Sequence, residues 1–92
     1  MILKYTKEAL QDLVRLKEFI EIKNPDAAQR ISAELVSGIE DLTKFPKMGI
    51  EVKDAPEPDI MRDIYISDYH IRYLALEKTI YILRIWHQKE NR

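Results

Sequence analysis

The sequence predicts an α+β domain in which a strand and a helical hairpin precede a small antiparallel sheet. Three observations predict this fold: two segments with apolar residues at helical spacing, a proline-rich loop, and three β-favouring segments joined by very short connections. The chain has 92 residues, which suffice for one domain. We therefore assign residues 1–92 to a single unit.

The first segments predict a strand followed by an amphipathic helix. Ile2 to Tyr5 alternates as a short strand does, and Thr6 is a suitable helix N-cap. The following residues place an apolar stripe on one face of the helix, formed by Ala9, Leu13, Leu16 and Ile20. The opposite, solvated face is predicted to carry Glu8, Gln11, Asp12, Arg15 and Glu18.

A second helix follows the boundary Asn24-Pro25-Asp26, where the proline ends one helix and suits the first turn of the next. Its buried stripe comprises Ala28, Ile31, Leu35, Ile39 and Leu42. A connection this short forces the two helices to lie antiparallel. Pro46 and Gly49 mark the end of the helical hairpin.

Residues 46–59 hold Pro46, Pro56 and Pro58, so we expect an exposed loop with a brief strand around residues 50–52. Three strands of an antiparallel meander then follow: Ile60 to Ile66, His70 to Leu76 and Thr79 to His87. In the last strand, strict alternation places Ile80 and Ile82 on one face and Tyr81, Leu83 and Ile85 on the other. With helices on one face, the remaining apolar surface is suited to a protein partner.

Composition excludes several classes of function. The chain has no cysteine, only two histidines and two glycines, so we expect no metal site, no cofactor and no nucleotide-binding loop. No segment approaches the roughly 20 apolar residues that span a bilayer, and no signal peptide is apparent. We therefore expect a cytosolic protein that does not associate with a membrane and has no small-molecule substrate. With a pI of about 6.1, it gains little electrostatic steering toward nucleic acid.

Arg84 lies within an otherwise apolar strand, Tyr81-Ile82-Leu83-Arg84-Ile85-Trp86. A buried guanidinium needs a carboxylate, a phosphate or water. Two interpretations stay open: an ion pair with an acidic residue of the helices, or an anion site on the open face of the sheet.

The other polar candidates also have structural alternatives. His87 could act as a general acid or base, or simply end the strand at the surface; three residues from Arg84, it should point to the opposite face. Arg62 shares the parity of Ile64 and Ile66, which favours a structural role over a phosphate clamp. Tyr73, Tyr81 and Trp86 are core or partner-contacting residues, and base stacking is a further possibility.

The order of these features resembles the RelE/ParE superfamily of bacterial type II toxins. The resemblance covers nearly the whole chain, and it is carried by Asp12-Leu13, Asn24 to Arg30, Phe45-Pro46, Gly49, Arg62, Tyr69 to Tyr73, Ile82 to Ile85, and His87. It implies a growth-inhibiting toxin that an antitoxin encoded beside it holds inactive.

The superfamily divides by target. ParE-like members inhibit DNA gyrase, whereas RelE-like members cleave messenger RNA in the ribosome. The Asn24 to Arg30 boundary and the Ile82 to His87 ending are more similar to ParE, and the loop lysines Lys47 and Lys53 are outnumbered by neighbouring acids. Gyrase inhibition is thus the favoured function, with Tyr73, Tyr81, Arg84, Trp86 and His87 as partner contacts. A ribonuclease, with Arg62, Arg84 and His87 catalytic, and a non-toxic interaction module are the alternatives.

Overall fold

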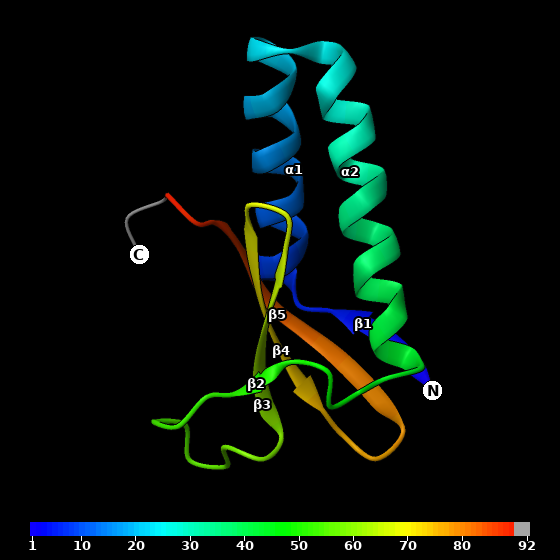
Figure 1. Ribbon diagram of the computed structural model, residues 1–92, viewed down its shortest axis with the longest axis vertical. Coiled ribbons are helices and arrows are strands. Elements are labelled where there is room, and N and C mark those ends of the chain that lie inside the picture. The colour runs from blue at the N-terminus through cyan, green and yellow to red at the C-terminus, as the bar shows by residue number, and fades with distance from the viewer. Residues whose placement is uncertain (90–92) are drawn as a thin grey trace.

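Two antiparallel helices pack on one face of a five-stranded sheet in a computed structural model that describes residues 1–89 (Figure 1). The strand order is β1-β5-β4-β3-β2, with β1 parallel to β5 and every other pair antiparallel. The predicted fold class is confirmed. The elements are β1 (Ile2–Tyr5), α1 (Lys7–Lys23), α2 (Pro25–Glu40), the 3-10 helix η1 (Asp41–Thr43), β2 (Ile50–Glu51), β3 (Met61–Ile66), β4 (Tyr69–Ala75) and β5 (Thr79–His87).

The ends of the helices form as their capping residues predict. The Thr6 hydroxyl accepts a hydrogen bond from the Ala9 amide at 3.0 Å, which starts α1. Asn24 serves both helices: its backbone N–H donates to the last turn of α1, and its side chain accepts from the Ala27 amide at the start of α2. This shared cap, followed by Pro25, explains why the hairpin turns within one residue.

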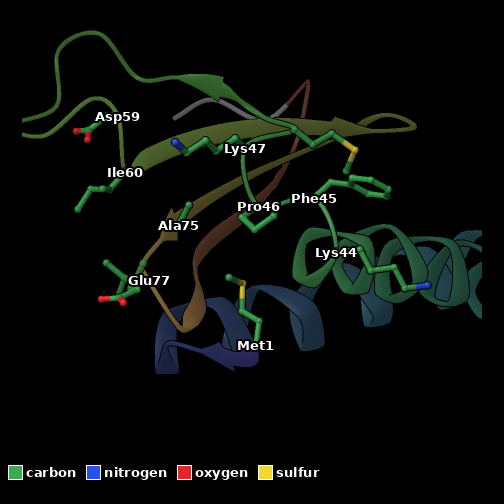
Figure 2. A pocket seen from close by; sticks show the side chains of 11 residues that line it. Met1, Lys44, Phe45, Pro46, Lys47, Asp59, Ile60, Ala75 and Glu77 are labelled. Carbon is green, nitrogen blue, oxygen red and sulfur yellow. The ribbon is translucent and has the colours of Figure 1, made fainter.

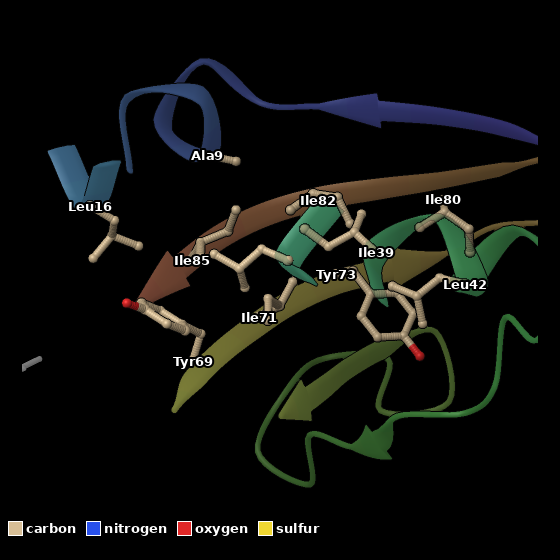
Figure 3. Packing of buried hydrophobic residues seen from close by; sticks show 11 residues of the cluster. Ala9, Leu16, Ile39, Leu42, Tyr69, Ile71, Tyr73, Ile80, Ile82 and Ile85 are labelled. Atoms are coloured by element: carbon tan, nitrogen blue, oxygen red, sulfur yellow. The ribbon is translucent and has the colours of Figure 1, made fainter. Parts of the chain in front are cut away.

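The core lies between the helices and the sheet (Figure 3). The helices contribute the stripes that the sequence predicts, among them Ala9, Leu16, Leu35 and Ile39. From the sheet, the fully buried side chains are Ile71, Tyr73, Ile80, Ile82 and Ile85. Apolar burial on this scale is the main driving force for folding a domain of this size.

A bulge in β5 alters which side chains face this core. Tyr73 pairs with Ile82 while its neighbour Arg72 pairs with Arg84, so Leu83 is an extra residue in β5. The predicted alternation is therefore wrong beyond Ile82. Ile85 joins Ile80 and Ile82 in the core instead of sharing a face with Tyr81.

Asp12 is a second correction. Helical spacing placed it among the solvated residues of α1, yet only 4% of it is exposed. Its carboxylate reaches the edge of β5 beyond the end of β1. In contrast, Leu10 and Val14, which flank the predicted stripe, are more than half exposed.

The loop between η1 and β2 is fixed by two buried side chains of the sheet. The Tyr73 hydroxyl accepts from the Gly49 amide at 2.9 Å and donates to the Pro46 carbonyl at 2.8 Å. Arg62 donates to the carbonyl of Gly49 at 2.9 Å. A Cβ at Gly49 would lie 2.7 Å from both the Asp63 carbonyl and the Tyr73 hydroxyl, so only glycine permits this close approach.

We predict that Tyr73→Phe destabilises the protein by about 1–3 kcal/mol, because the Gly49 amide and the Pro46 carbonyl lose their buried partner. Urea denaturation of the variant and the wild type measures the difference. Tyr65→Phe is the matched control, since Tyr65 is 52% exposed and its hydroxyl can be replaced by water. Equal losses in the two variants would contradict the anchoring role.

Candidate functional site

The face of the sheet turned away from the helices carries two cross-strand rows of polar and aromatic side chains. One row is Asp63, Arg72 and Arg84; the next is Tyr65, His70 and Trp86. Each row takes one residue from β3, one from β4 and one from β5. We call these six residues the open-face cluster.

Arg84 is held by Asp12. The Arg84 Nε and Nη2 atoms donate to the two carboxylate oxygens at 2.8 and 3.2 Å, and the Ile85 amide donates to Asp12 Oδ2 at 2.9 Å. Burial by itself would raise the pKa of Asp12, but the hydrogen bonds from Arg84 and Ile85 outweigh it and lower that pKa. The same hydrogen bonds raise the pKa of Arg84. Of the two interpretations left open by the sequence, the structure shows the ion pair with an acidic residue of a helix.

Asp63 organises the middle of the cluster. It accepts two hydrogen bonds from Arg72, at 2.9 and 3.0 Å, and lies 2.8 Å from His70 Nε2. The hydrogen bonds that Arg72 donates to Asp63 raise the pKa of Arg72. Two guanidinium groups that stand directly opposite across β4 and β5 would repel each other. Here each has its own carboxylate, which permits the pairing.

Trp86 lies at the centre of these contacts. The guanidinium carbons of Arg84 and Arg72 lie 5.3 and 5.6 Å from its ring centroid, within the range of cation–π attraction. The His70 ring packs against it at 5.1 Å and stacks on Tyr65 at 4.7 Å. The cluster is thus a patch of aromatic and cationic groups whose orientations are fixed by packing and by ion pairs.

The residues singled out by sequence lie in three separate places. Arg84, Trp86 and Tyr81 are on the open face. Tyr73, a predicted partner contact, is fully buried in the core and is not at a surface that a partner reaches. His87 lies on the helix side of the sheet at the end of β5, edge-on to Tyr69 at 5.2 Å.

Arg62, Arg84 and His87 therefore do not form one site. Arg62 is 9% exposed and is committed to backbone carbonyls of the 47–59 loop, which confirms the structural interpretation. Arg84 and His87 point to opposite faces, as predicted, because the bulge precedes both. The sequence did not indicate the roles of Asp12, Asp63 and His70, which organise the open face. The register that pairs Arg72 with Arg84 could have indicated the two carboxylates, because two arginines directly opposite each other each need an acidic partner.

Within residues 1–89, no group of three or more His, Asp or Glu side chains is arranged to hold a metal ion. No helix in the same range has the length and apolar character to cross a bilayer.

The structure is a small α+β module with a patch of aromatic and cationic side chains on one face of its sheet, and comparison with known proteins identifies the family. The family described as the ParE toxin of the type II toxin–antitoxin system parDE matches residues 3–92 of this chain. Toxin RelE1 of Caulobacter vibrioides is 32% identical over 84 residues, covering 91% of this chain and 89% of that protein. Toxin RelE2 of the same organism is 29% identical over 83 residues, covering 90% of each.

A solved structure agrees in fold. The chromosomal ParDE toxin–antitoxin system from P. aeruginosa superposes with a TM-score of 0.78 over 95% of each chain, at 22% identity. The chain belongs to the ParE toxin family, within the RelE/ParE superfamily, and is the toxin of a type II toxin–antitoxin system. Membership implies a cognate antitoxin as its partner.

We predict that Asp12→Asn destabilises the protein by about 1–3 kcal/mol at neutral pH, because the bond from Arg84 loses its ionised partner. Arg84 is 43% exposed, so water screens part of the loss. The lowered pKa means that Asp12 contributes stability above its unfolded pKa of about 3.9, and that this contribution is lost as the pH falls through the folded pKa.

Denaturation between neutral pH and about pH 2 measures the effect. The difference between wild type and Asp12→Asn should shrink as the medium becomes acidic. Glu18→Gln, an exposed carboxylate on the same helix, is the control and should show little change. A difference that stays constant with pH would contradict the ionised Asp12–Arg84 pair.

Proposed function

We propose that this toxin arrests growth by binding DNA gyrase and blocking replication, and that it has no nuclease activity of its own. The observation that carries the proposal is the separation of Arg62, Arg84 and His87 on the fold. The match to the ParE toxin family is consistent with it.

Cleavage of RNA requires a cation placed for the charge that develops at the phosphorus, together with an acid or base close by. The Arg62 guanidinium donates its hydrogen bonds to backbone carbonyls of the loop, and Arg84 is bound to Asp12. His87 lies on the other face of the sheet from Arg84. These positions favour binding over in-ribosome cleavage.

The open-face cluster, with Tyr81 beside it, is the surface that we propose for gyrase. Tryptophan, tyrosine and arginine are the residues that most often dominate the energy of protein interfaces. The orientations of Arg84 and Arg72 are already fixed by Asp12 and Asp63, so these two side chains lose little conformational entropy on binding. Arg84 and Trp86 would be its central contacts.

A gyrase inhibitor acts where DNA is replicated, so we also propose a cytoplasmic location.

A supercoiling assay with purified gyrase tests the proposal. The wild-type toxin should inhibit supercoiling. Trp86→Ala should weaken inhibition about tenfold or more, because it removes the centre of the cluster, whereas His87→Ala should retain it. Ile22→Ala, at a position 85% exposed on α1, controls for general effects, and melting curves confirm that each variant is folded.

The ribonuclease alternative predicts a different pattern. Supercoiling would be unaffected by the wild-type toxin, mRNA would be cut in the ribosomal A site in a toeprinting assay, and His87→Ala would abolish the cut. That pattern would overturn the gyrase proposal. If neither supercoiling nor mRNA were affected while growth still stopped, gyrase would likewise be excluded as the target.

A further inference from the structure

His70 is a buried ionisable side chain at the centre of the open-face cluster. Only 4% of it is exposed, although this face of the sheet is turned away from the helices. Its ring is stacked on Tyr65 at 4.7 Å and packs against Trp86 at 5.1 Å, so rings from β3 and β5 cover it. Histidine is the side chain whose charge ordinarily changes near physiological pH. The open face therefore holds, beneath its surface, a group that can take up a proton.

His70 and Arg72 share one carboxylate oxygen. His70 Nε2 lies 2.8 Å from Asp63 Oδ2, and the same oxygen accepts a hydrogen bond from Arg72 Nη2 at 3.0 Å. A ring nitrogen that faces a carboxylate carries a hydrogen in the neutral ring, so a further proton goes to Nδ1 and gives the ring a full positive charge. The ring then attracts Oδ2 more strongly and competes with Arg72 Nη2 for it.

The charged and titratable groups around His70 come from all three strands of the cluster. Asp63 and Tyr65 face it from β3, Arg72 follows on β4, and Arg84 lies on β5 opposite Arg72. Each arginine is paired with one carboxylate, so these pairs carry no net charge while His70 is neutral. Protonation adds one positive charge that has no carboxylate of its own. The open face then attracts negative charge.

We propose that protonation of His70 draws Asp63 Oδ2 toward the imidazolium and releases Arg72 Nη2 to donate to a carboxylate of the target. The Arg72 side chain is 34% exposed, against 15% for Asp63 and 5% for His70, so Arg72 is the group that a partner reaches. His70 is a positioning residue that acts through Asp63, because Tyr65 and Trp86 cover it. The inference rests on the proposed function, since it describes the target surface that docks on the open face.

NMR titration of the free toxin tests the first step. The ring signals of His70 and the Nε–H signal of Arg72 should change with one midpoint between about pH 5 and pH 8, because the same proton moves both. Trp86 is the only tryptophan of the chain, so its fluorescence should follow the same transition. Asp63→Asn should lower the midpoint, since it removes the neighbouring negative charge. His70→Gln should abolish the change at Arg72.

Two further variants are matched controls. His87→Gln removes the other histidine, which lies on the helix side of the sheet. Phe45→Ala alters an apolar groove at the far end of the strands, lined among others by Phe45, Ile60 and Ala75 (Figure 2). The described residues that line this groove include none of the open-face cluster. Both controls should keep the transition of Arg72 and its midpoint.

The second step is tested with purified gyrase. Binding of the full-length toxin is measured at about pH 8 and about pH 6, on either side of the expected midpoint. The wild type should bind about two- to fivefold more tightly at the lower pH, which is the effect of one added charge at a partly exposed site. His70→Gln and Arg72→Gln should lack this gain. Comparing them with the wild type at each pH removes the effect of groups that titrate on gyrase.

Two results would overturn the proposal. One is an Arg72 signal that does not change together with the His70 ring; this measurement is made on the wild type, so it decides the first step even if a variant fails to fold. The other is equal pH dependence of binding in the wild type and in His70→Gln, with melting curves that show the variant to be folded. If the toxin bound gyrase at neither pH while His70 and Arg72 still titrated together, the gyrase target would fall and the release of Arg72 would be supported.

Discussion

The buried carboxylate of Asp12 links elements that lie far apart in the sequence. It joins the first helix to the part of the β5 edge that β1 leaves unpaired, where it accepts hydrogen bonds from the Ile85 amide and the Arg84 guanidinium. β1 covers only the first half of that edge, since its last pair is Tyr5 with Ile82. Without Asp12, the backbone just beyond the bulge would have a buried N–H with no acceptor, and such a group is costly.

This anchored bulge decides which chemistry each face of the sheet presents. The extra residue, Leu83, returns Ile85 to the core and turns Arg84 and Trp86 outward. The Arg84 guanidinium then lies over the Trp86 ring and opposite Arg72, and Asp63 neutralises the charge of Arg72. The result is a surface on which both arginines are already paired with carboxylates. Such a surface suits protein binding better than phosphoryl chemistry, which needs a cation free to meet new charge.

The sequence predicted the elements well because caps, prolines and apolar spacing act locally. Thr6, Asn24 and Pro25 set the helix ends, and the meander strands begin and end within one residue of expectation. The open-face cluster was harder to predict, because it depends on pairings between residues that are distant in the sequence. Asp12 and Arg84 are 72 residues apart, and helical spacing gave no reason to bury a carboxylate. The bulge at Leu83 also follows from tertiary packing, so strict alternation misplaced Ile85. The burial of Tyr73 required the loop around Gly49, whose course local patterns do not determine.

Photo-crosslinking from position 86 tests whether the open face of the sheet contacts gyrase. Trp86 would be replaced by p-benzoylphenylalanine in the otherwise unchanged toxin, and Ile22, on the exposed face of α1, would be replaced in a second sample. After irradiation with purified gyrase, we expect a covalent adduct from position 86 and none from position 22. Adducts from position 22 alone, or none from position 86 in a sample that still inhibits supercoiling, would contradict it.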